Sequence, residues 1–224
     1  MKQMALDIGL PTGPTLANFC AGPNLDALRH LELWVGASAR SPVPTYLWGI
    51  SGSGKTHLLK AAREGLREQG ARVGWLDVNT LEPVDYNESW AAVVLDDVHL
   101  YTAAQQHTAF NWFVNAQTLQ RPVLAAGEFA PVELQLRDDL RTRLGWGHIF
   151  HLQPLSEAER RAVLRQAADA RGVFLSDEVM DFMLTRFSRD LASLMELLGL
   201  LDGYALQTKR AITIPLIKSM MDNA

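Results

Sequence analysis

The residues best suited to chemistry lie in one short run, GISGSGKT, from Gly49 to Thr56. Glycines at this spacing let backbone N–H groups turn inward around an anion, and a lysine and a hydroxyl group follow at once. This is the pattern G-x-x-x-x-G-K-[ST], in which the lysine faces the β and γ phosphates of a nucleotide. The competing interpretation is a glycine-rich turn that binds nothing. We predict phosphate binding by Gly49, Ile50, Ser51, Gly52, Ser53, Gly54, Lys55 and Thr56.

Two adjacent carboxylates, Asp96 and Asp97, end the apolar run VVLDD farther along the chain. Magnesium prefers oxygen ligands, so Asp96 and the hydroxyl group of Thr56 are candidate Mg²⁺ ligands beside the phosphates. Asp97 is the candidate to orient or deprotonate an attacking water molecule, a task that often falls to the longer glutamate. Alternatively, the two acids only end a strand and begin a turn.

The scaffold for these residues follows from the pattern of apolar runs. Five short runs are predicted as strands with helical patterns between them, at residues 45–49, 72–78, 91–97, 121–127 and 148–153. Strands that are apolar throughout are buried on both faces, which is typical of a parallel sheet covered by helices. We therefore predict an α/β fold with a five-stranded parallel sheet, in which the phosphate-binding run follows the first strand and opens a helix.

The pattern becomes wholly helical after residue 153. Ser156 and Glu159 have the spacing of a capping box, and Gly172 is a typical helix stop. Further helical patterns cover residues 176–187, 189–207 and 213–221. The predicted organisation is an extended, Gly- and Pro-containing arm, a nucleotide-binding α/β domain and a small all-helical domain, at residues 1–24, 25–153 and 154–224.

Composition narrows the class of protein. Among 224 residues, 48% are hydrophobic and 21% are charged, which is typical of a folded chain. Cys20 is the single cysteine, so no disulfide framework or cysteine-based metal site is expected, in keeping with a reducing compartment. No signal peptide and no membrane-spanning run is apparent, and we expect a cytoplasmic protein without a membrane partner. The net charge of −4 argues against DNA as the main partner and against direct sequence-specific DNA binding.

Over nearly its whole length the sequence resembles the AAA+ class of P-loop proteins, and within it the ATPase domain of the replication initiator DnaA. It is more similar still to the Hda type of DnaA-related regulatory inactivators, which work with the sliding clamp of DNA polymerase. The resemblance rests on the motifs GISGSGKTHLL, VVLDDV, LRTRLGWGHIFHLQPLSEAE, ARGVFLSDEV and TIPLIKSMM. It implies a AAA+ fold with the helical domain as a lid, and ADP or ATP with Mg²⁺ as ligands.

The resemblance assigns roles that chemistry alone leaves open. Arg143, in LRTRLGWG, stands where such proteins carry an arginine finger, which stabilises the transition-state charge on a neighbour's nucleotide. Arg141 is the alternative for this role, and without the resemblance either residue is an ordinary surface arginine. The stretch NFCAGPN is expected to pass close to the adenine, which makes Phe19 a candidate nucleotide contact.

The arm carries a second candidate site, QMALDI, which resembles the clamp-binding motif Q-L-x-L-P-L. An extended segment with a glutamine head and spaced apolar residues suits a groove with a polar entrance and apolar pockets. The candidate clamp contacts are Gln3, Met4, Leu6 and Ile8. Asp7 stands in place of the motif's proline and weakens the match, and the alternative is that the apolar residues pack on this protein's own core.

Two departures from the DnaA pattern concern nucleotide sensing. Glu128 ends the fourth predicted strand where an Asp, Asn or Thr is usual. Ala192 takes the place of a lid arginine that touches the nucleotide, with Arg189 one turn earlier. Loss of this sensor favours ADP holding or slow turnover, so we expect weak intrinsic ATP hydrolysis. DnaA continues into a helix-turn-helix domain, for which this sequence, ending at Ala224, has no room, so we do not expect an initiator.

Three functions are compatible with these features. The leading one is a nucleotide-dependent regulator that binds the sliding clamp and presents Arg143 to DnaA-bound ATP, which promotes hydrolysis and inactivates the initiator. The second is an oligomeric AAA+ ATPase that loads a helicase or remodels DNA, in which case self-association is expected. The third is a small P-loop kinase, against which the helical C-terminal domain and the paired aspartates argue.

Overall fold

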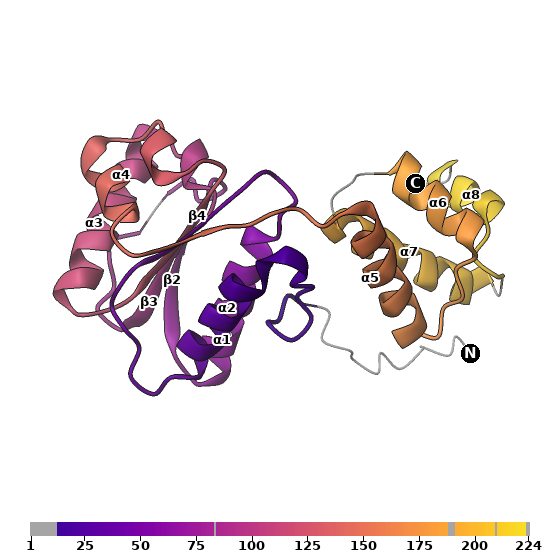
Figure 1. The fold of residues 1–224 in the computed structure, drawn as a ribbon, viewed down its shortest axis with the longest axis horizontal. Helices are drawn as coiled ribbons and strands as arrows, with labels where there is room; N and C mark the ends of the chain where they lie inside the picture. The colour runs from indigo at the N-terminus through magenta and orange to yellow at the C-terminus, as the bar shows by residue number, and fades with distance from the viewer. Residues whose placement is uncertain (1–12, 83, 188–190, 209, 223–224) are drawn as a thin grey trace. The chain divides into compact units, whose positions relative to one another are not determined.

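The computed structural model describes residues 13–222 except 83, 188–190 and 209, and the side chains of Ala192 and Asp222 also lie outside the description. The chain divides into two compact units after Gln153, except that the short stretch Ser51–Ser53 groups with the second unit. Figure 1 shows an α/β unit followed by a unit made only of helices. None of the helices in the described part of the chain combines the length and the apolar character needed to cross a bilayer.

The α/β unit is built on five parallel strands in the order β2-β3-β4-β1-β5. They are β1 Thr45–Trp48, β2 Arg72–Leu76, β3 Trp90–Leu95, β4 Val123–Gly127 and β5 His148–His151. The predicted five-stranded parallel sheet is therefore confirmed. Because all strands point the same way, the ends of β1, β3 and β4 lie at one edge of the sheet, with β4 between the other two. Strand β3 ends at Leu95, so Asp96 and Asp97 lie just beyond it at this edge.

Helices cover both faces of this sheet, as Figure 1 shows. Helices α1 (Leu25–Gly36) and α2 (Lys55–Glu68) lie on one face, and α3 (Ala103–Thr118) and α4 (Asp138–Leu144) lie on the other. Neighbouring residues of a strand point to opposite faces, and in β1 Tyr46 joins the core under α3 while Leu47 joins the core under α2. Single turns of 3-10 helix lie at η1 Gly22–Asn24, η2 Val98–Leu100 and η3 Pro131–Glu133.

Helix α4 is an element for which the sequence analysis made no prediction. It is short, and its charges match the helix dipole, with Asp138 and Asp139 in the first turn and Arg141 and Arg143 in the last. Its apolar contribution is confined to Leu140 and Leu144, which are buried against the sheet. A pattern of two apolar positions is too sparse to identify a helix by its periodicity.

Residues 13–24, the described part of the predicted arm, pack on the α/β unit. Leu16, Phe19 and Ala21 lie against the core that α1 and α2 form on the sheet. Asn24 fastens the end of this segment, because its side-chain amide donates to the carbonyl oxygen of Gln153 at 2.8 Å and accepts the N–H of Gln153 at 2.8 Å. This part of the chain is therefore anchored where the sequence suggested an extended arm.

The second unit contains the helices α5 Glu157–Ala170, α6 Asp177–Arg186, α7 Leu191–Thr208 and α8 Ile214–Asp222. The predicted capping box is confirmed, since the Ser156 hydroxyl accepts the Glu159 N–H and the Glu159 carboxylate accepts the Ser156 N–H. The core of the helical unit consists of buried aliphatic and methionine side chains, including Leu164, Met180, Met183, Leu198, Leu201 and Ile217. Arg161 and Arg165 of α5 pair with Asp177 at the start of α6.

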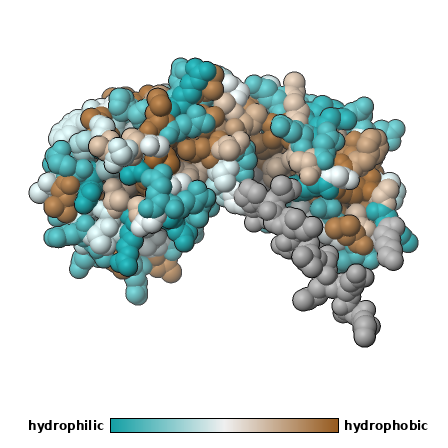
Figure 2. All heavy atoms as spheres, turned by 90° about the horizontal axis from the view of Figure 1, so that it is seen from below, coloured by the Kyte–Doolittle hydropathy of each residue, from teal (hydrophilic) through white to brown (hydrophobic). Residues whose placement is uncertain are grey.

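The surface of both units is mixed in character. Figure 2 shows hydrophilic residues over much of one face of the molecule, with smaller apolar areas between them. The exposed large apolar side chains include Leu33, Leu81, Val132 and Trp146 in the α/β unit and Phe174 and Leu206 in the helical unit. Single exposed apolar residues are ordinary, so only those beside a built site carry a functional argument.

The close contact of β2 with β3 gives a test of the sheet. A Cβ atom at Gly74 would overlap the indole ring of Trp90, whereas a Cβ atom at Gly36 would meet nothing within 4 Å. We expect Gly74→Ala to lower the free energy of unfolding by about 1–3 kcal/mol through overpacking. All six tryptophans belong to the α/β unit, so urea unfolding followed by tryptophan fluorescence reports on that unit.

Gly36→Ala is the matched control for this experiment. It adds the same methyl group at the end of a helix, and it should leave stability unchanged or raise it by about 0.5–1 kcal/mol. Equal effects of the two substitutions would contradict the packing of Gly74 against Trp90.

Candidate functional site: the phosphate loop and the acidic pair

The loop from Gly49 to Thr56 leaves β1 and enters α2 with a backbone path that glycine permits. Gly52 has φ 77° and Gly54 has φ 98°, both in the left-handed region. Gly54 is the N-cap of α2, so the helix begins at Lys55 and its first N–H groups face the loop. Gly49 donates its N–H to the carbonyl oxygen of Gly127 at 3.3 Å, which ties the loop to the neighbouring strand β4. A helix N-terminus opening behind a glycine loop is a ready site for an anion.

Lys55 points back into this loop. Its Nζ donates to the carbonyl oxygens of Gly49 at 2.6 Å and Ile50 at 3.0 Å, and the residue is only 5% exposed. Burial lowers the pKa of Lys55, and the negative charges of Asp97, Asp96 and Glu128 partly offset this effect. The ammonium group therefore lies within the phosphate loop, held by two of its carbonyl oxygens and with carboxylates nearby.

Ser53 supplies an independent sign that the loop is made for a ligand. Its hydroxyl oxygen is buried and has no hydrogen-bond partner within the described part of the chain. Buried hydroxyl groups in native proteins are nearly always paired, and an orphan requires an explanation. A phosphate oxygen seated in the loop is a suitable acceptor for this hydroxyl group.

Asp96 and Thr56 meet across the sheet edge, since the Thr56 hydroxyl donates to Asp96 Oδ1 at 3.2 Å. Burial, with a smaller contribution from the charge of Asp97, raises the pKa of Asp96 to about 6, although hydrogen bonds from Thr56 and the Asp97 N–H act in the opposite direction. The pair offers an uncharged and a charged oxygen side by side. Both are ligand types that magnesium accepts, so these residues fit the ion.

Asp97 departs from ordinary backbone geometry. Its φ of 51° and ψ of 44° are left-handed, a conformation that costs a non-glycine residue free energy. Asp97 is the N-cap of the short helix η2, so the turn leads directly into that helix. No group of three or more histidine, cysteine and acidic side chains able to hold a metal occurs among the residues that the structure describes.

Glu128 at the end of β4 is paired with His99 of η2. The Glu128 N–H donates to His99 Nδ1 at 3.3 Å, and the Glu128 carboxylate lies 3.4 Å from His99 Nε2. Because a backbone N–H can only donate, Nδ1 is the acceptor and Nε2 carries the proton that faces the carboxylate. His99 was not identified from the sequence as part of the site, and no spacing signal connects it to Glu128.

Phe19, which the resemblance assigns to the adenine, lies against the phosphate loop. A Cβ atom at Gly54 would sit 2.7 Å from Phe19 Cε2, so the ring covers the loop at the start of α2. His57 holds this segment, because its Nε2 donates to the carbonyl oxygen of Thr15 at 3.1 Å and its ring lies 5.4 Å from that of Phe19. Burial lowers the pKa of His57, an effect that the hydrogen bond to Thr15 partly offsets.

Arg143 stands on the last turn of α4, apart from the loop in the sequence. Its guanidinium lies over the rings of Phe110 and Trp146, at 5.1 Å and 5.0 Å from their centroids. Arg141 is different, because it pairs with Asp138 at 2.7 Å. Asp139 pairs with Arg137 at 2.7 Å, which lowers the pKa of Asp139, and the charge of Arg143 adds a smaller effect without forming an ion pair within 4 Å among the described residues. Trp146 is 60% exposed. The structure thus presents Arg143 as a fixed cation on aromatic rings and engages Arg141 in a surface ion pair.

Most of the other residues singled out in the sequence lie outside the part of the chain that the structure describes. Gln3, Met4, Leu6, Asp7 and Ile8 lie outside the described residues, as do Arg189 and the side chain of Ala192. Arg171 caps the C-terminus of α5, and its Nη1 is buried without a partner in the described part of the chain. The clamp contacts and the lid sensor therefore stay predictions.

The sequence and the fold are similar to those of known proteins. Residues 157–221 match the family model described as Hda, lid domain. Domain III of the Thermotoga maritima replication initiation protein DnaA is similar with a TM-score of 0.75 and 20% identity, over 96% of this chain and 98% of that one. AMPPCP-bound DnaA from Aquifex aeolicus has a TM-score of 0.65 and 24% identity, over 87% of this chain and 66% of that one. The Thermotoga maritima RuvB Holliday junction branch migration motor has a TM-score of 0.64 and 17% identity, over 93% and 71%.

The fold is therefore that of the AAA+ class, a P-loop α/β domain followed by a small helical domain. The helical unit matches the Hda lid-domain model over residues 157–221, and the chain as a whole has the fold of DnaA domain III. The resemblance that the motifs indicated is confirmed at this level.

The raised pKa of Asp96 predicts a pH-dependent stability. Ionised Asp96 is buried at a cost, so its contribution to stability is fully present below its ordinary pKa and is lost as the pH rises through about 6. Asp96→Asn keeps an oxygen acceptor for Thr56 and removes the charge. We expect the variant apoprotein to be more stable than wild type at pH 8 by about 1–3 kcal/mol.

The measurement is urea unfolding by tryptophan fluorescence at pH 5 and pH 8 without nucleotide or metal. The difference between variant and wild type should shrink at pH 5, where wild-type Asp96 is protonated. A difference of the same size at both pH values would contradict the raised pKa.

Proposed function

We propose that this protein is a nucleotide-dependent regulator of replication initiation that stimulates hydrolysis of DnaA-bound ATP and thereby inactivates the initiator. It acts while bound to the DNA polymerase sliding clamp. Its own nucleotide sets its conformational state, and the reaction takes place on the nucleotide of the partner.

Nucleotide binding is supported by the loop itself. The left-handed glycines, the inward ammonium of Lys55 and the orphan hydroxyl of Ser53 together suit a phosphate chain. Phe19, which lies on Gly54, is placed to contact the rest of the nucleotide. The similarity in fold to AMPPCP-bound DnaA points the same way. We infer ADP or ATP as the ligand.

Thr56 and Asp96 would hold Mg²⁺, which supplies charge neutralisation to the phosphates when bound. The Thr56 hydroxyl and the Asp96 carboxylate already lie within hydrogen-bond distance of each other. A cation beside Asp96 favours the ionised carboxylate and so offsets the cost of its burial.

Weak intrinsic hydrolysis fits the residues that surround the phosphates. Asp97, the candidate to orient a water molecule, is short and stands on a strained turn. Glu128 is engaged by His99 through both its carboxylate and its N–H. A paired Glu128 is poorly suited to sense a γ phosphate, because a carboxylate repels it.

The observation that carries the proposal is the presentation of Arg143. A cation that must reach a partner's phosphate needs a fixed position and no competing carboxylate. The ring centroids of Phe110 and Trp146 lie 5.1 Å and 5.0 Å from the guanidinium carbon, and among the described residues neither ring competes with a phosphate for its N–H groups. Arg143 is thus the residue we propose as the arginine finger, and the segment from Gln3 to Ile8 is the one we propose for the clamp.

Loss of the lysine charge tests nucleotide binding. Lys55→Ala should weaken ADP and ATP binding by about tenfold to 100-fold, because it removes a charge-assisted contact to phosphate. Arg67→Ala is the matched control, since Arg67 is an exposed cation on the same helix that pairs only with Glu64 among the described residues. Isothermal titration calorimetry with each nucleotide in the presence of Mg²⁺ measures the effect, and equal affinities for the two variants would contradict the site.

Removal of the proposed arginine finger tests the regulatory function. The rate of hydrolysis of ATP pre-bound to DnaA is measured with clamp loaded on DNA, in the presence of the wild type, Arg143→Ala or Arg141→Ala. An arginine finger is worth about 10³–10⁵ in rate, so Arg143→Ala should return hydrolysis to near its unstimulated rate. Arg141→Ala should keep most of the stimulation, because Arg141 is committed to Asp138.

Omission of the clamp is a further control, and stimulation should then fall. No stimulation by the wild type would remove the inactivator function. That result would favour the alternative, an oligomeric AAA+ motor or helicase loader, which the similarity in fold to RuvB and the intact Lys55, Thr56 and Asp96 permit. Oligomers formed with ATP and turnover stimulated by DNA would then be expected.

A further inference from the structure

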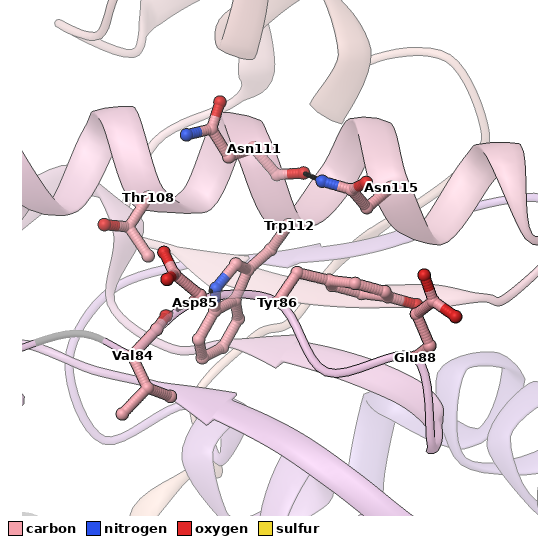
Figure 3. A pocket seen from close by; sticks show the side chains of 8 residues that line it. All are labelled: Val84, Asp85, Tyr86, Glu88, Thr108, Asn111, Trp112 and Asn115. Carbon is pink, nitrogen blue, oxygen red and sulfur yellow. Dashed lines mark hydrogen bonds between the residues drawn. The ribbon is translucent and has the colours of Figure 1, made fainter.

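A cavity lies in the α/β unit, lined by none of the residues of the phosphate loop. It has a volume of about 280 Å³ and is formed by one side of α3 and the segment between β2 and β3. Figure 3 shows the residues that line it, which are Val84, Asp85, Tyr86, Glu88, Thr108, Asn111, Trp112 and Asn115. Neither the proposed nucleotide site nor Arg143 uses any of these residues.

The lining is rich in hydrogen-bond acceptors. Asp85 and Glu88 contribute two exposed carboxylates, and no ion pair to either is found within the described residues. The donors are largely engaged: the Trp112 indole N–H donates to the carbonyl oxygen of Val84 at 3.0 Å, and the Asn115 amide donates to that of Asn111 at 2.8 Å (Figure 3). The ligand that suits such a cavity brings N–H donors and a positive charge.

Tyr86 adds an unsatisfied group to the cavity. Its hydroxyl oxygen is buried and has no hydrogen-bond partner in the part of the chain that the structure describes. In Figure 3 its side chain extends toward that of Glu88. A buried hydroxyl group without a partner is uncommon, and here it lines a polar cavity that a ligand can enter.

Aromatic rings form the apolar part of the site. Tyr86 lines the cavity and is partly exposed. Its ring lies 5.5 Å from that of Trp90, which in turn lies 4.5 Å from the ring of Trp112, a lining residue that is only 1% exposed. Aromatic rings attract cations through their π faces, and flat guanidinium groups stack on them particularly well. Carboxylates, an unpaired hydroxyl group and aromatic rings together are the elements of a guanidinium site.

We propose that this cavity binds the guanidinium group of an arginine side chain presented by a partner protein. Asp85 and Glu88 line the cavity with two carboxylates, which disfavour an anion there, although the charge of Arg121 also acts on Tyr86. The volume suits one side chain, since it lies below the usual range of about 300–1,000 Å³ for sites of drug-sized molecules. Leu81 and Val84 on the same segment are 90% and 62% exposed, which provides an apolar rim for a protein surface.

The test uses capped arginine, Nα-acetyl-L-arginine amide, as the probe and the full chain as the protein. The Trp112 indole N–H is followed in ¹H–¹⁵N spectra, because it lies at the cavity and bonds to Val84. We expect a saturable shift of this resonance with the arginine probe and none with the citrulline analogue, which has the same shape and no charge. Equal shifts with both probes, or no shift, would overturn the proposal.

Two substitutions distinguish binding in the cavity from general attraction to the negative charge of the segment between β2 and β3. Glu88→Gln should weaken binding of the probe by about threefold to tenfold, because it removes one carboxylate partner. Glu82→Gln removes an exposed carboxylate from the same segment outside the cavity lining and should leave binding unchanged. Both positions are exposed, and the same spectra report whether each variant is folded. Equal weakening by the two substitutions would contradict a built site.

Free L-arginine distinguishes a side chain from a small molecule. Free L-arginine brings an α-ammonium and an α-carboxylate that a residue within a protein chain lacks, and a cavity suited to the side chain alone should bind the capped probe at least as tightly. Tighter binding of free arginine would overturn the assignment to a partner protein and indicate a small-molecule ligand.

Discussion

The burial of charge at one edge of the sheet is the constraint on which the site depends. Lys55 and Asp96 are both almost fully buried, and neither could remain charged there without partners. Lys55 is held by two carbonyl oxygens of its own loop and by the nearby carboxylates. Asp96 is held by the Thr56 hydroxyl and the Asp97 N–H. Each group is satisfied only because the ends of β1, β3 and β4 meet at this edge.

This arrangement explains why the surrounding elements take the form they do. The loop needs left-handed glycines so that its carbonyl and N–H groups can surround one ammonium and one phosphate chain. Helix α2 needs a close approach to α1, which the small Gly65 beside Val35 permits. The segment of Phe19 closes over Gly54 and is pinned by His57 of the same helix. Nucleotide site and helix packing are therefore parts of one structure.

The two arginines of α4 are held in different ways, one by a carboxylate of the same helix and one by aromatic rings. Arg141 is neutralised by Asp138 on its own helix, whereas Arg143 is held by aromatic rings that restrict its motion without neutralising its charge. A guanidinium held in this way contributes no ion pair to its own chain among the described residues, and its charge is suited to an anion of a partner. The cavity beside Trp112 has the complementary character, because it offers carboxylates and an unpaired hydroxyl group to a cation from outside.

Much of this protein was determined by local sequence. The phosphate loop, the strand before it, the acidic pair and the capping box of Ser156 all follow from short patterns, because glycine spacing, apolar runs and cap residues act within a few positions. The parallel sheet followed from strands that are apolar on both faces. Helix α4 did not, because two apolar residues give too little periodicity. The tertiary structure alone decided which groups from distant segments meet: His99 with Glu128, Phe19 with Gly54, Arg143 with Phe110, and Tyr86 with Trp112 around a cavity. Such contacts depend on packing between segments far apart in the chain, and packing has no signature in the spacing of residues.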